Sequence, residues 1–260
     1  MKLLIPWSGG LDSTALIYRR LKEGHEVIAI RFALENNEKQ TAGEELAVKN
    51  LSHYFKQELD DKFSFEYAKT PFACVHLCRG SFIQPVLWSS FLGIAASALG
   101  DFDAIEMAYV LNDDACSYLL EISRQIRNSY AICARPSSKR KFRISFPLIK
   151  FAKRELWDSL PNGLRYSIHF CEFSNNPCGQ CFSCKRFERE VMAIVDFMLQ
   201  REDFKSQFKT PNLDEKIEEV DYKDPDAGDY AELPLKMPAL SERGAAAAEG
   251  DDLRSDGPNF

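Results

Sequence analysis

Short apolar runs alternate with helix-length amphipathic segments along the first 200 residues of the chain. The apolar runs predict strands over residues 2–7, 26–32, 63–67, 103–109 and 142–146. Apolar positions at helical spacing predict helices over residues 13–22, 38–59, 82–99, 115–126, 152–160 and 185–200. Strands separated by helices favour a parallel sheet, because a parallel crossover needs a dozen or more residues. The predicted fold class is therefore α/β, with helices on both faces of the sheet.

Two of these helices carry specific expectations about burial. In the helix over 38–59, an apolar side made of Leu46, Leu51, Tyr54 and Phe55 is expected to face the core. The helix over 82–99 is apolar nearly all round, which predicts that it is buried.

The last fifty residues differ from the rest in charge and complexity. Residues 211–260 hold 14 acidic and 5 basic side chains, in a chain whose formal net charge is -6. This composition predicts a poorly ordered acidic tail, with a tail docked over an edge as the alternative. The body that remains is mildly basic, which suits an anionic ligand. We expect three parts: an α/β domain over 1–165, a cysteine-rich segment and helix over 166–210, and the tail over 211–260.

No apolar stretch reaches the length of a membrane span, and the N-terminus has no basic-then-apolar leader. We therefore expect a cytoplasmic protein with no membrane partner. Eight cysteines in such a chain argue against a disulfide framework.

A glycine-rich loop follows the first predicted strand. It reads Ser8, Gly9, Gly10, Leu11, Asp12, Ser13. Adjacent glycines let backbone N–H groups approach an anion, and the N-terminus of the next helix points at the same place. Phosphates would repel the carboxylate of Asp12 unless it has another role, so we expect it to be either a Mg²⁺ ligand or the acidic residue of the first helical turn. The loop matches neither a Walker A motif nor a Gly-x-Gly-x-x-Gly fingerprint.

Four cysteines lie close together near the end of the predicted body. They are Cys171, Cys178, Cys181 and Cys184. Thiolates at this spacing can surround Zn²⁺ tetrahedrally and leave no open position, so the site would be structural. A redox pair of Cys178 and Cys181 and an iron–sulfur cluster are the alternatives, and His169 is a reserve ligand.

The loop resembles the PP-loop of the N-type ATP pyrophosphatases, which hold the β- and γ-phosphates of ATP and transfer AMP to a substrate oxygen. Together with Pro147-Leu148, Lys153-x-Glu155-Leu156 and Cys178-Gly-x-Cys181-x-x-Cys184-x-Arg186, the chain over residues 1–200 resembles the QueC-like 7-cyano-7-deazaguanine (preQ0) synthase family. The resemblance implies a Rossmann-like sheet of the adenine nucleotide alpha hydrolase type, with a zinc knuckle and helix after it.

The same resemblance implies a ligase reaction and assigns roles to residues. The enzyme would convert 7-carboxy-7-deazaguanine and ammonia to the amide or the nitrile, using ATP. The loop residues Ser8 to Ser13 would bind ATP and Mg²⁺, Asp12 and Lys153 would be catalytic, and the four cysteines would bind Zn²⁺. A solvent-exposed helix lysine is the alternative for Lys153. The binding partners of the enzyme would be the deazapurine and ammonia, and no direct contact with nucleic acid is expected. The resemblance also makes a homodimer possible.

Two segments depart from that family and keep other functions open. Pro85-Val86-Leu87-Trp88 stands where the family has Pro-x-Arg-Asn, and Asn112-Asp113-Asp114 stands where it has Gly-Tyr-Pro-Asp. One alternative is a PP-loop tRNA-modifying sulfurtransferase, for which Cys74 and Cys78 are the available pair. The other is a nucleotide-binding homologue that has lost catalysis.

Overall fold

The computed structural model describes residues 1–33, 38–59, 63–69, 83–99, 101–135 and 140–207, with residues Met1–Pro211 forming one compact unit. The expected tail over 211–260 and the pair Cys74 and Cys78 lie outside the described residues. The three-part division of the chain therefore stays a prediction.

The centre of the molecule is a five-stranded, wholly parallel sheet in the order β3-β2-β1-β4-β5. Its strands are β1 (Lys2–Pro6), β2 (Glu26–Ala33), β3 (Phe63–Lys69), β4 (Ala104–Glu106) and β5 (Arg143–Ser145). The strand order reverses direction at β1, since the chain moves outward to β2 and β3 and then returns to β4 on the other side. Ligands of such sheets bind at the carboxyl ends of the strands beside this reversal.

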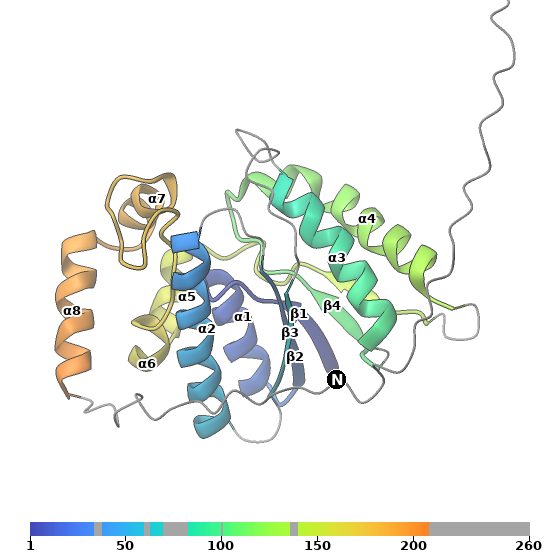
Figure 1. The fold of residues 1–260 in the computed structure, drawn as a ribbon, viewed down its shortest axis with the longest axis horizontal. Helices are drawn as coiled ribbons and strands as arrows, with labels where there is room; N and C mark the ends of the chain where they lie inside the picture. Colours follow the sequence, from blue (N-terminus) through green and yellow to red (C-terminus); the bar gives the residue numbers. More distant parts are fainter. Residues whose placement is uncertain (34–37, 60–62, 70–82, 100, 136–139, 208–260) are drawn as a thin grey trace, which may run out of the picture. The chain divides into compact units, whose positions relative to one another are not determined.

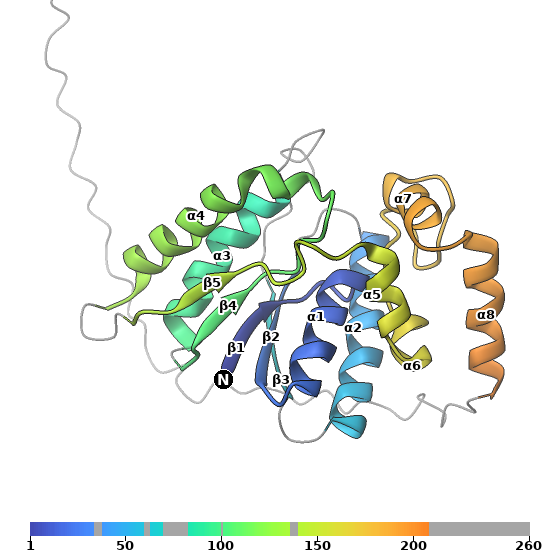
Figure 2. The same ribbon diagram turned by 180° about the vertical axis from the view of Figure 1, so that it is seen from behind.

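Helices cover both faces of the sheet, as the sequence predicted (Figure 1). The helices are α1 (Leu11–Lys22), α2 (Glu38–Glu58), α3 (Ile83–Leu99), α4 (Leu119–Cys133), α5 (Lys153–Ser159), α6 (Asn162–Arg165), α7 (Phe182–Glu190) and α8 (Ile194–Gln207). The view from behind in Figure 2 also places α3 and α4 on one face and α1 and α2 on the other. Among the described residues, no helix combines the length and the apolarity needed to cross a membrane.

The central strands β1 and β2 bury both of their faces, because helices pack on each side. Leu3 and Ile5 of β1 join the core beneath α1 and α2, whereas Leu4 between them joins the core beneath α3 and α4. The same alternation holds in β2, where Val27 and Ile28 lie in different cores. All of these side chains are at most 6% exposed, which accounts for the continuous apolar runs of the sequence.

The single helix predicted over 185–200 is wrong, because the structure has two helices there. α7 already begins at Phe182, and it ends at Glu190, because the next residue, Val191, has a φ of -123° and a ψ of -72° that are not helical. The carbonyl of Val191 accepts a hydrogen bond from Arg154 Nη1 at 2.5 Å. A side chain from α5 therefore satisfies a backbone group at the break, which periodicity along one segment does not reveal.

Four smaller expectations also differ from the structure. Leu46 is 51% exposed, and Ala47 and Val48 take its expected place in the core. The helix predicted from residue 115 starts as a short 3-10 helix η2 (Asp114–Tyr118), and β4 is shorter than predicted. α3 packs against α4, yet Val86 and Ile94 on it remain exposed, so it is buried on one side only.

Candidate active site and metal centre

The glycine loop lies between β1 and α1, at the carboxyl edge of the sheet. Gly9 has a φ of +76°, and a Cβ there would stand 3.1 Å from Val48 Cγ2 of α2, so the loop needs glycine for its conformation and its packing. Gly10 is the N-cap of α1, and its N–H donates to Ser8 Oγ at 3.3 Å. Ser8 and Ser13 bring their hydroxyl oxygens to 3.4 Å from each other. The loop therefore presents hydroxyl groups and a helix N-terminus to the same space.

Asp12 and Lys153 meet in this space, although 141 residues separate them in sequence. Lys153 Nζ stands 2.5 Å from Asp12 Oδ2, and the side chains are only 15% and 19% exposed. The second carboxylate oxygen of Asp12 is buried without a hydrogen-bond partner in the described structure. A cation binding there would satisfy it, which agrees with the expected Mg²⁺ role of Asp12. Lys153 is a half-buried residue of the site, and not a solvent-exposed helix lysine.

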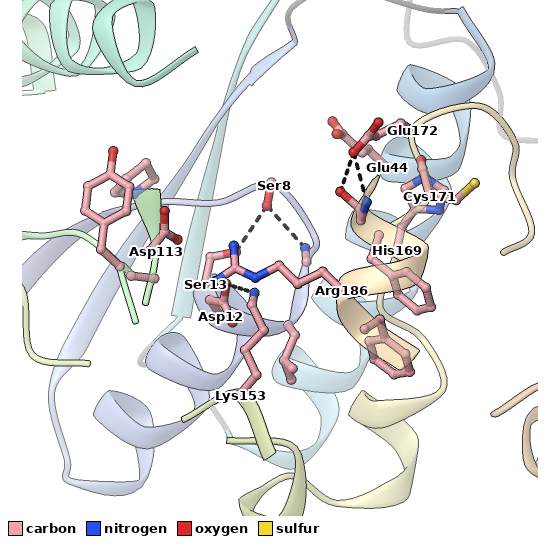
Figure 3. Close-up of a pocket in the computed structure, with 18 of the residues that line it drawn as sticks. Ser8, Asp12, Ser13, Glu44, Asp113, Lys153, His169, Cys171, Glu172 and Arg186 are labelled. Carbon is pink, nitrogen blue, oxygen red and sulfur yellow. Dashed lines mark hydrogen bonds and ion pairs between the residues drawn. The ribbon is translucent and has the colours of Figure 1, made fainter. Parts of the chain in front are cut away.

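A cavity of about 360 Å³ contains the loop and extends from it toward α7. Figure 3 shows Ser8, Asp12 and Ser13 beside Lys153 and Arg186, with His169, Cys171 and Glu172 farther along its wall. Pro85 and Trp88 line it as well, so one of the two departures from the preQ0 synthase pattern contributes apolar side chains to this wall.

The second segment that departs from the preQ0 synthase pattern, residues 112–114, also lines the cavity, through Asp113. Asp113 caps η2, since its Oδ1 accepts from the N–H of Ala115 at 3.1 Å. Burial raises the pKa of the Asp113 carboxyl above its usual value, and the neighbouring Asp12 charge acts in the same direction. The N–H of Ala115 and the cations Arg186 and Lys153 oppose the rise.

Asp113→Asn should raise stability at neutral pH and not in acid. The folded state binds the Asp113 proton more tightly than the unfolded state does, so its stability falls as pH rises through the two pKa values. Asparagine keeps an oxygen for the N–H of Ala115. The melting temperature of the variant should exceed that of the wild type at pH 7. It should match that of the wild type at about pH 3, where the Asp113 carboxyl is largely protonated in both the folded and the unfolded state. Asp114→Asn, at an exposed neighbour, is the matched control, and an equal gain at both pH values would contradict the prediction.

The four predicted cysteines come together as a candidate metal centre. The Sγ atoms of Cys171, Cys178, Cys181 and Cys184 all lie within 4.8 Å of one another, and those of Cys178 and Cys184 stand 3.9 Å apart. Thiolates bound to one zinc ion at about 2.3 Å would stand about 3.8 Å from each other. The donor set therefore fits a tetrahedral, thiolate-binding metal ion with no open position.

Backbone hydrogen bonds prepare the cysteine knuckle, residues 171–184, for thiolates. Hydrogen bonds from the N–H groups of Gln180 and Cys181 lower the pKa of the Cys178 thiol to about 6. Burial instead raises the pKa of Cys181 and Cys184. A bound cation is what would compensate the burial of those two thiolates, because metal binding removes their protons.

His169 connects the cysteine knuckle to the glycine loop. The backbone N–H of His169 donates to the carbonyl oxygen of Gly9 at 3.0 Å, and its ring nitrogen Nε2 stands 2.8 Å from the carbonyl oxygen of Cys171. Burial lowers the pKa of His169, so at neutral pH the ring is uncharged and Nε2 carries the hydrogen that it donates. Its ring also packs on Gly43, where a Cβ would come within 2.4 Å of it. His169 is therefore a structural link between the two sites, and the metal-binding cluster does not include it.

Several residues of the cavity wall had no role in the sequence prediction. They are Glu44, Asp113, Glu172 and Arg186. Arg186 belongs to the motif Cys184-x-Arg186, and Asp113 lies in a segment noted for its departure, so both had a weak signal. Glu44 pairs with the buried Arg31 of β2 at 3.2 Å, and nothing in the amphipathic pattern of its helix marks it as a site residue.

The comparisons with known proteins agree with the PP-loop interpretation for part of the chain. No family model matches. The sequence is 30% identical over 116 residues to the tRNA-specific 2-thiouridylase MnmA 3 of Bacteroides fragilis, a match that covers 40% of this chain and 32% of that protein. The chain thus spans about a third of the length of the curated relatives that it matches.

Solved structures resemble the chain only in general arrangement. The U34-tRNA thiolase NcsA from Methanococcus maripaludis has a TM-score of 0.44 and 17% identity, over 80% of this chain and 74% of that chain. A 4-thiouridine synthetase in an RNA complex with bound ATP has a TM-score of 0.47 and 17% identity, over 78% and 52%. The chain is thus similar over 116 residues to a tRNA-specific 2-thiouridylase, and its glycine loop lies at the carboxyl edge of a parallel sheet.

Proposed function

We propose that this chain is an ATP-dependent enzyme that transfers AMP to a substrate oxygen, and that this oxygen is the carbonyl oxygen of a uracil base in tRNA. The observation that carries the ATP chemistry is the meeting of the glycine loop, Asp12 and Lys153 in one cavity. The match to a tRNA 2-thiouridylase over 116 residues supports the choice of acceptor. This proposal replaces the expectation that the protein makes no direct nucleic-acid contact.

The proposed reaction has two steps. In the first, the base oxygen attacks the α-phosphorus of ATP, the bond to the β-phosphate oxygen breaks, and pyrophosphate leaves. In the second, a hydrosulfide ion from a sulfide donor attacks the activated carbon, the bond from that carbon to the AMP-bearing oxygen breaks, AMP leaves with the oxygen, and loss of the sulfur-bound proton leaves the thiocarbonyl. No cysteine of the described residues is assigned as the sulfur carrier.

The residues of the cavity would serve the first step. The N-terminus of α1 and the hydroxyls of Ser8 and Ser13 would hold the departing pyrophosphate, and the Lys153 ammonium would stabilise charge that develops on phosphate oxygens. Asp12 would orient Lys153 and bind Mg²⁺, which neutralises phosphate charge when present. The four cysteines would bind Zn²⁺ as a structural ion.

A second acceptor, 7-carboxy-7-deazaguanine with ammonia, remains a candidate because of one specific observation. The four cysteines that the preQ0 synthase resemblance designates as ligands do cluster in space, within 4.8 Å. Against it stand the two altered segments, since Pro85, Trp88 and Asp113 all line the cavity.

The deciding experiment measures pyrophosphate release from ATP and Mg²⁺ with each acceptor in parallel, and identifies the product by mass spectrometry. One reaction contains tRNA without thiolated uridine and a sulfide donor, and the other contains 7-carboxy-7-deazaguanine and ammonium. Release that depends on tRNA, with a thiolated uridine, would support the proposal. Release that depends on the deazaguanine would overturn it in favour of an amide or nitrile synthase. ATP binding without release in either reaction would contradict both acceptors and favour a non-catalytic homologue.

A further inference from the structure

The cysteine knuckle leads directly into a helix that forms one wall of the cavity. α7 begins after Cys181, whose Sγ accepts from the N–H of Cys184 at 3.3 Å. Ser183 in the same turn donates both its N–H and its hydroxyl to Glu172 Oε1, at 3.1 and 2.6 Å. Of the four candidate metal ligands, Cys181 thus caps α7 and Cys184 lies in its first turn, and Arg186 follows in the next turn. Metal binding would therefore fix the start of this helix.

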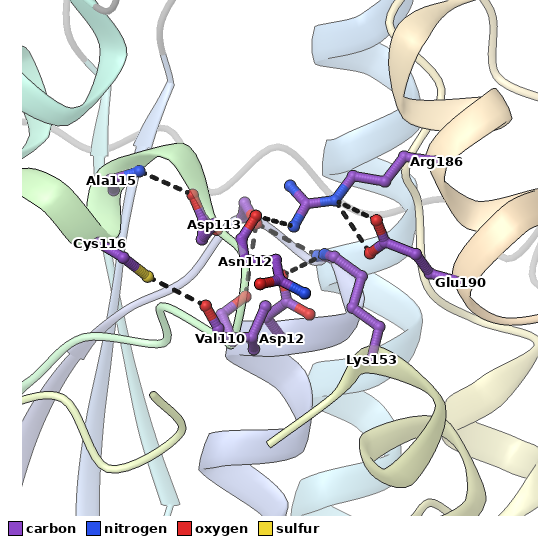
Figure 4. A network of polar contacts seen from close by, with 12 residues as sticks. Asp12, Val110, Asn112, Asp113, Ala115, Cys116, Lys153, Arg186 and Glu190 are labelled. Atoms are coloured by element: carbon purple, nitrogen blue, oxygen red, sulfur yellow. Dashed lines mark hydrogen bonds and ion pairs between the residues drawn. The ribbon is translucent and has the colours of Figure 1, made fainter. Parts of the chain in front are cut away.

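Arg186 is held firmly at the cavity wall. Its Nε donates to both carboxylate oxygens of Glu190, at 3.2 and 3.0 Å, and its Nη2 donates to the carbonyl of Asn112 at 3.3 Å (Figure 4). Asn112 has a φ of +63°, a conformation that asparagine tolerates better than most residues. The Arg186 side chain is only 14% exposed. In the described structure, its Nη1 has no protein acceptor.

Arg186 is one of two cations among the described charged side chains of the cavity wall. Carboxylates outnumber cations on this wall, with Asp12, Glu44, Asp113 and Glu172 against Lys153 and Arg186. Both cations are paired, Lys153 with Asp12 at 2.5 Å and Arg186 through its Nε with Glu190 at 3.0 Å. Arg186 keeps free N–H groups in a planar fork, which matches two phosphate oxygens at once. The charges of Arg186, Lys153 and Asp12 all shift the pKa of the Asp113 carboxyl, so these four groups lie within one small region of the cavity.

We propose that Arg186 binds the pyrophosphate part of the nucleotide from the side opposite the glycine loop, and that metal binding by the cysteine knuckle holds α7 where this contact forms. The inference rests on the proposed function only for the use of ATP, not for the acceptor. Its consequence is thermodynamic coupling: bound metal strengthens pyrophosphate binding, and bound pyrophosphate strengthens metal binding by the same factor. The cysteine knuckle is then part of the nucleotide site as well as a structural support.

The first test compares variants of the metal-loaded protein by calorimetric titration with magnesium pyrophosphate. Arg186→Gln removes the charge and the fork, so its affinity should be about tenfold to a hundredfold lower than that of the wild type. Arg189→Gln is the matched control, because Arg189 pairs with the same Glu190 at 2.7 Å but is 69% exposed. The control should bind within about twofold of the wild type, as exposed pairs contribute little.

The outcomes separate this inference from the proposed function. A wild type that does not bind pyrophosphate would overturn both. Wild-type binding that Arg186→Gln leaves unchanged would overturn the role of Arg186 alone, as would an equal loss in Arg189→Gln.

The second test measures the coupling from the metal side. The rate at which a chromophoric chelator removes the metal is followed with magnesium pyrophosphate, with AMP and without either. Pyrophosphate should slow removal several-fold from the wild type and from Arg189→Gln, and not from Arg186→Gln. Mg²⁺ is kept at one concentration in all three reactions, and free pyrophosphate, which itself binds metal ions, would speed removal, so slower removal reflects an effect on the protein. A removal rate that pyrophosphate does not change in the wild type would overturn the coupling.

Discussion

Asp12→Asn is expected to lower ATP-dependent pyrophosphate release by about a thousandfold or more, because it removes a charge at the centre of the glycine loop. The Asp12 carboxylate does two things that an amide does not: it neutralises Lys153 at 2.5 Å, and it offers a second, buried oxygen to a cation. The shape of the side chain is retained, so the fold should survive. Release is measured with saturating ATP and Mg²⁺, and folding is checked by circular dichroism and by thermal unfolding.

A matched control and a double variant make this prediction specific. Asp158→Asn removes a carboxylate that is 54% exposed and pairs with Arg154 four residues earlier, so its release rate should stay near that of the wild type. If Asp12 acts through Lys153, then Asp12→Asn combined with Lys153→Met should cost no more than the worse single variant. A normal rate in Asp12→Asn would refute the catalytic role, and additive losses would show that the two residues act independently.

Cys184→Ser is expected to abolish metal binding and to destabilise the protein by several kcal/mol. Cys184 is fully buried, and three protein thiolates without the fourth bind a structural ion far more weakly. The free energy of binding a structural zinc ion is on the order of 10 kcal/mol, and part of it stabilises the fold. Elemental analysis should find one equivalent of metal in the wild type and much less in the variant, with a lower melting temperature. Chelation of the wild type should reproduce that change.

Cys133→Ser is the control for this experiment, since Cys133 is exposed and lies outside the cluster. It should keep both metal content and stability. The same elemental analysis decides among the interpretations of the cluster: zinc supports the structural site, iron with acid-labile sulfide supports an iron–sulfur cluster, and a metal-free wild type supports a redox pair. Full metal content and unchanged stability in Cys184→Ser would contradict the assignment of Cys184 as a ligand.

The cavity places the two chemical motifs of the chain within one structural unit. His169 joins the carbonyl of Gly9 on the loop to the carbonyl of Cys171 in the cysteine knuckle, and α7 closes the wall between them. A change at either motif would therefore reach the other through hydrogen bonds and packing over a short distance. This arrangement is why we expect metal content and nucleotide affinity to vary together.

Local patterns were enough to predict the fold class, the glycine loop and the cysteine cluster. Each depends on residues that are neighbours in sequence: a strand buries its own apolar run, Gly9 and Gly10 turn the backbone beside a helix N-terminus, and closely spaced thiols converge within one turn-rich segment. The family resemblance alone implied that Asp12 and Lys153 serve one site, and their contact was not predicted, because 141 positions separate them in sequence.

Only the tertiary structure decided what surrounds these motifs. Asp113, Glu44 and Arg186 reach the cavity from three separate elements, and no periodicity in their own segments marks them. The break between α7 and α8 likewise depends on a side chain of α5 that satisfies a carbonyl at the end of α7. Hydrogen bonds and charges that act within a few residues can be read along the chain, whereas those that act across the cavity depend on how the sheet and its helices bring distant segments together.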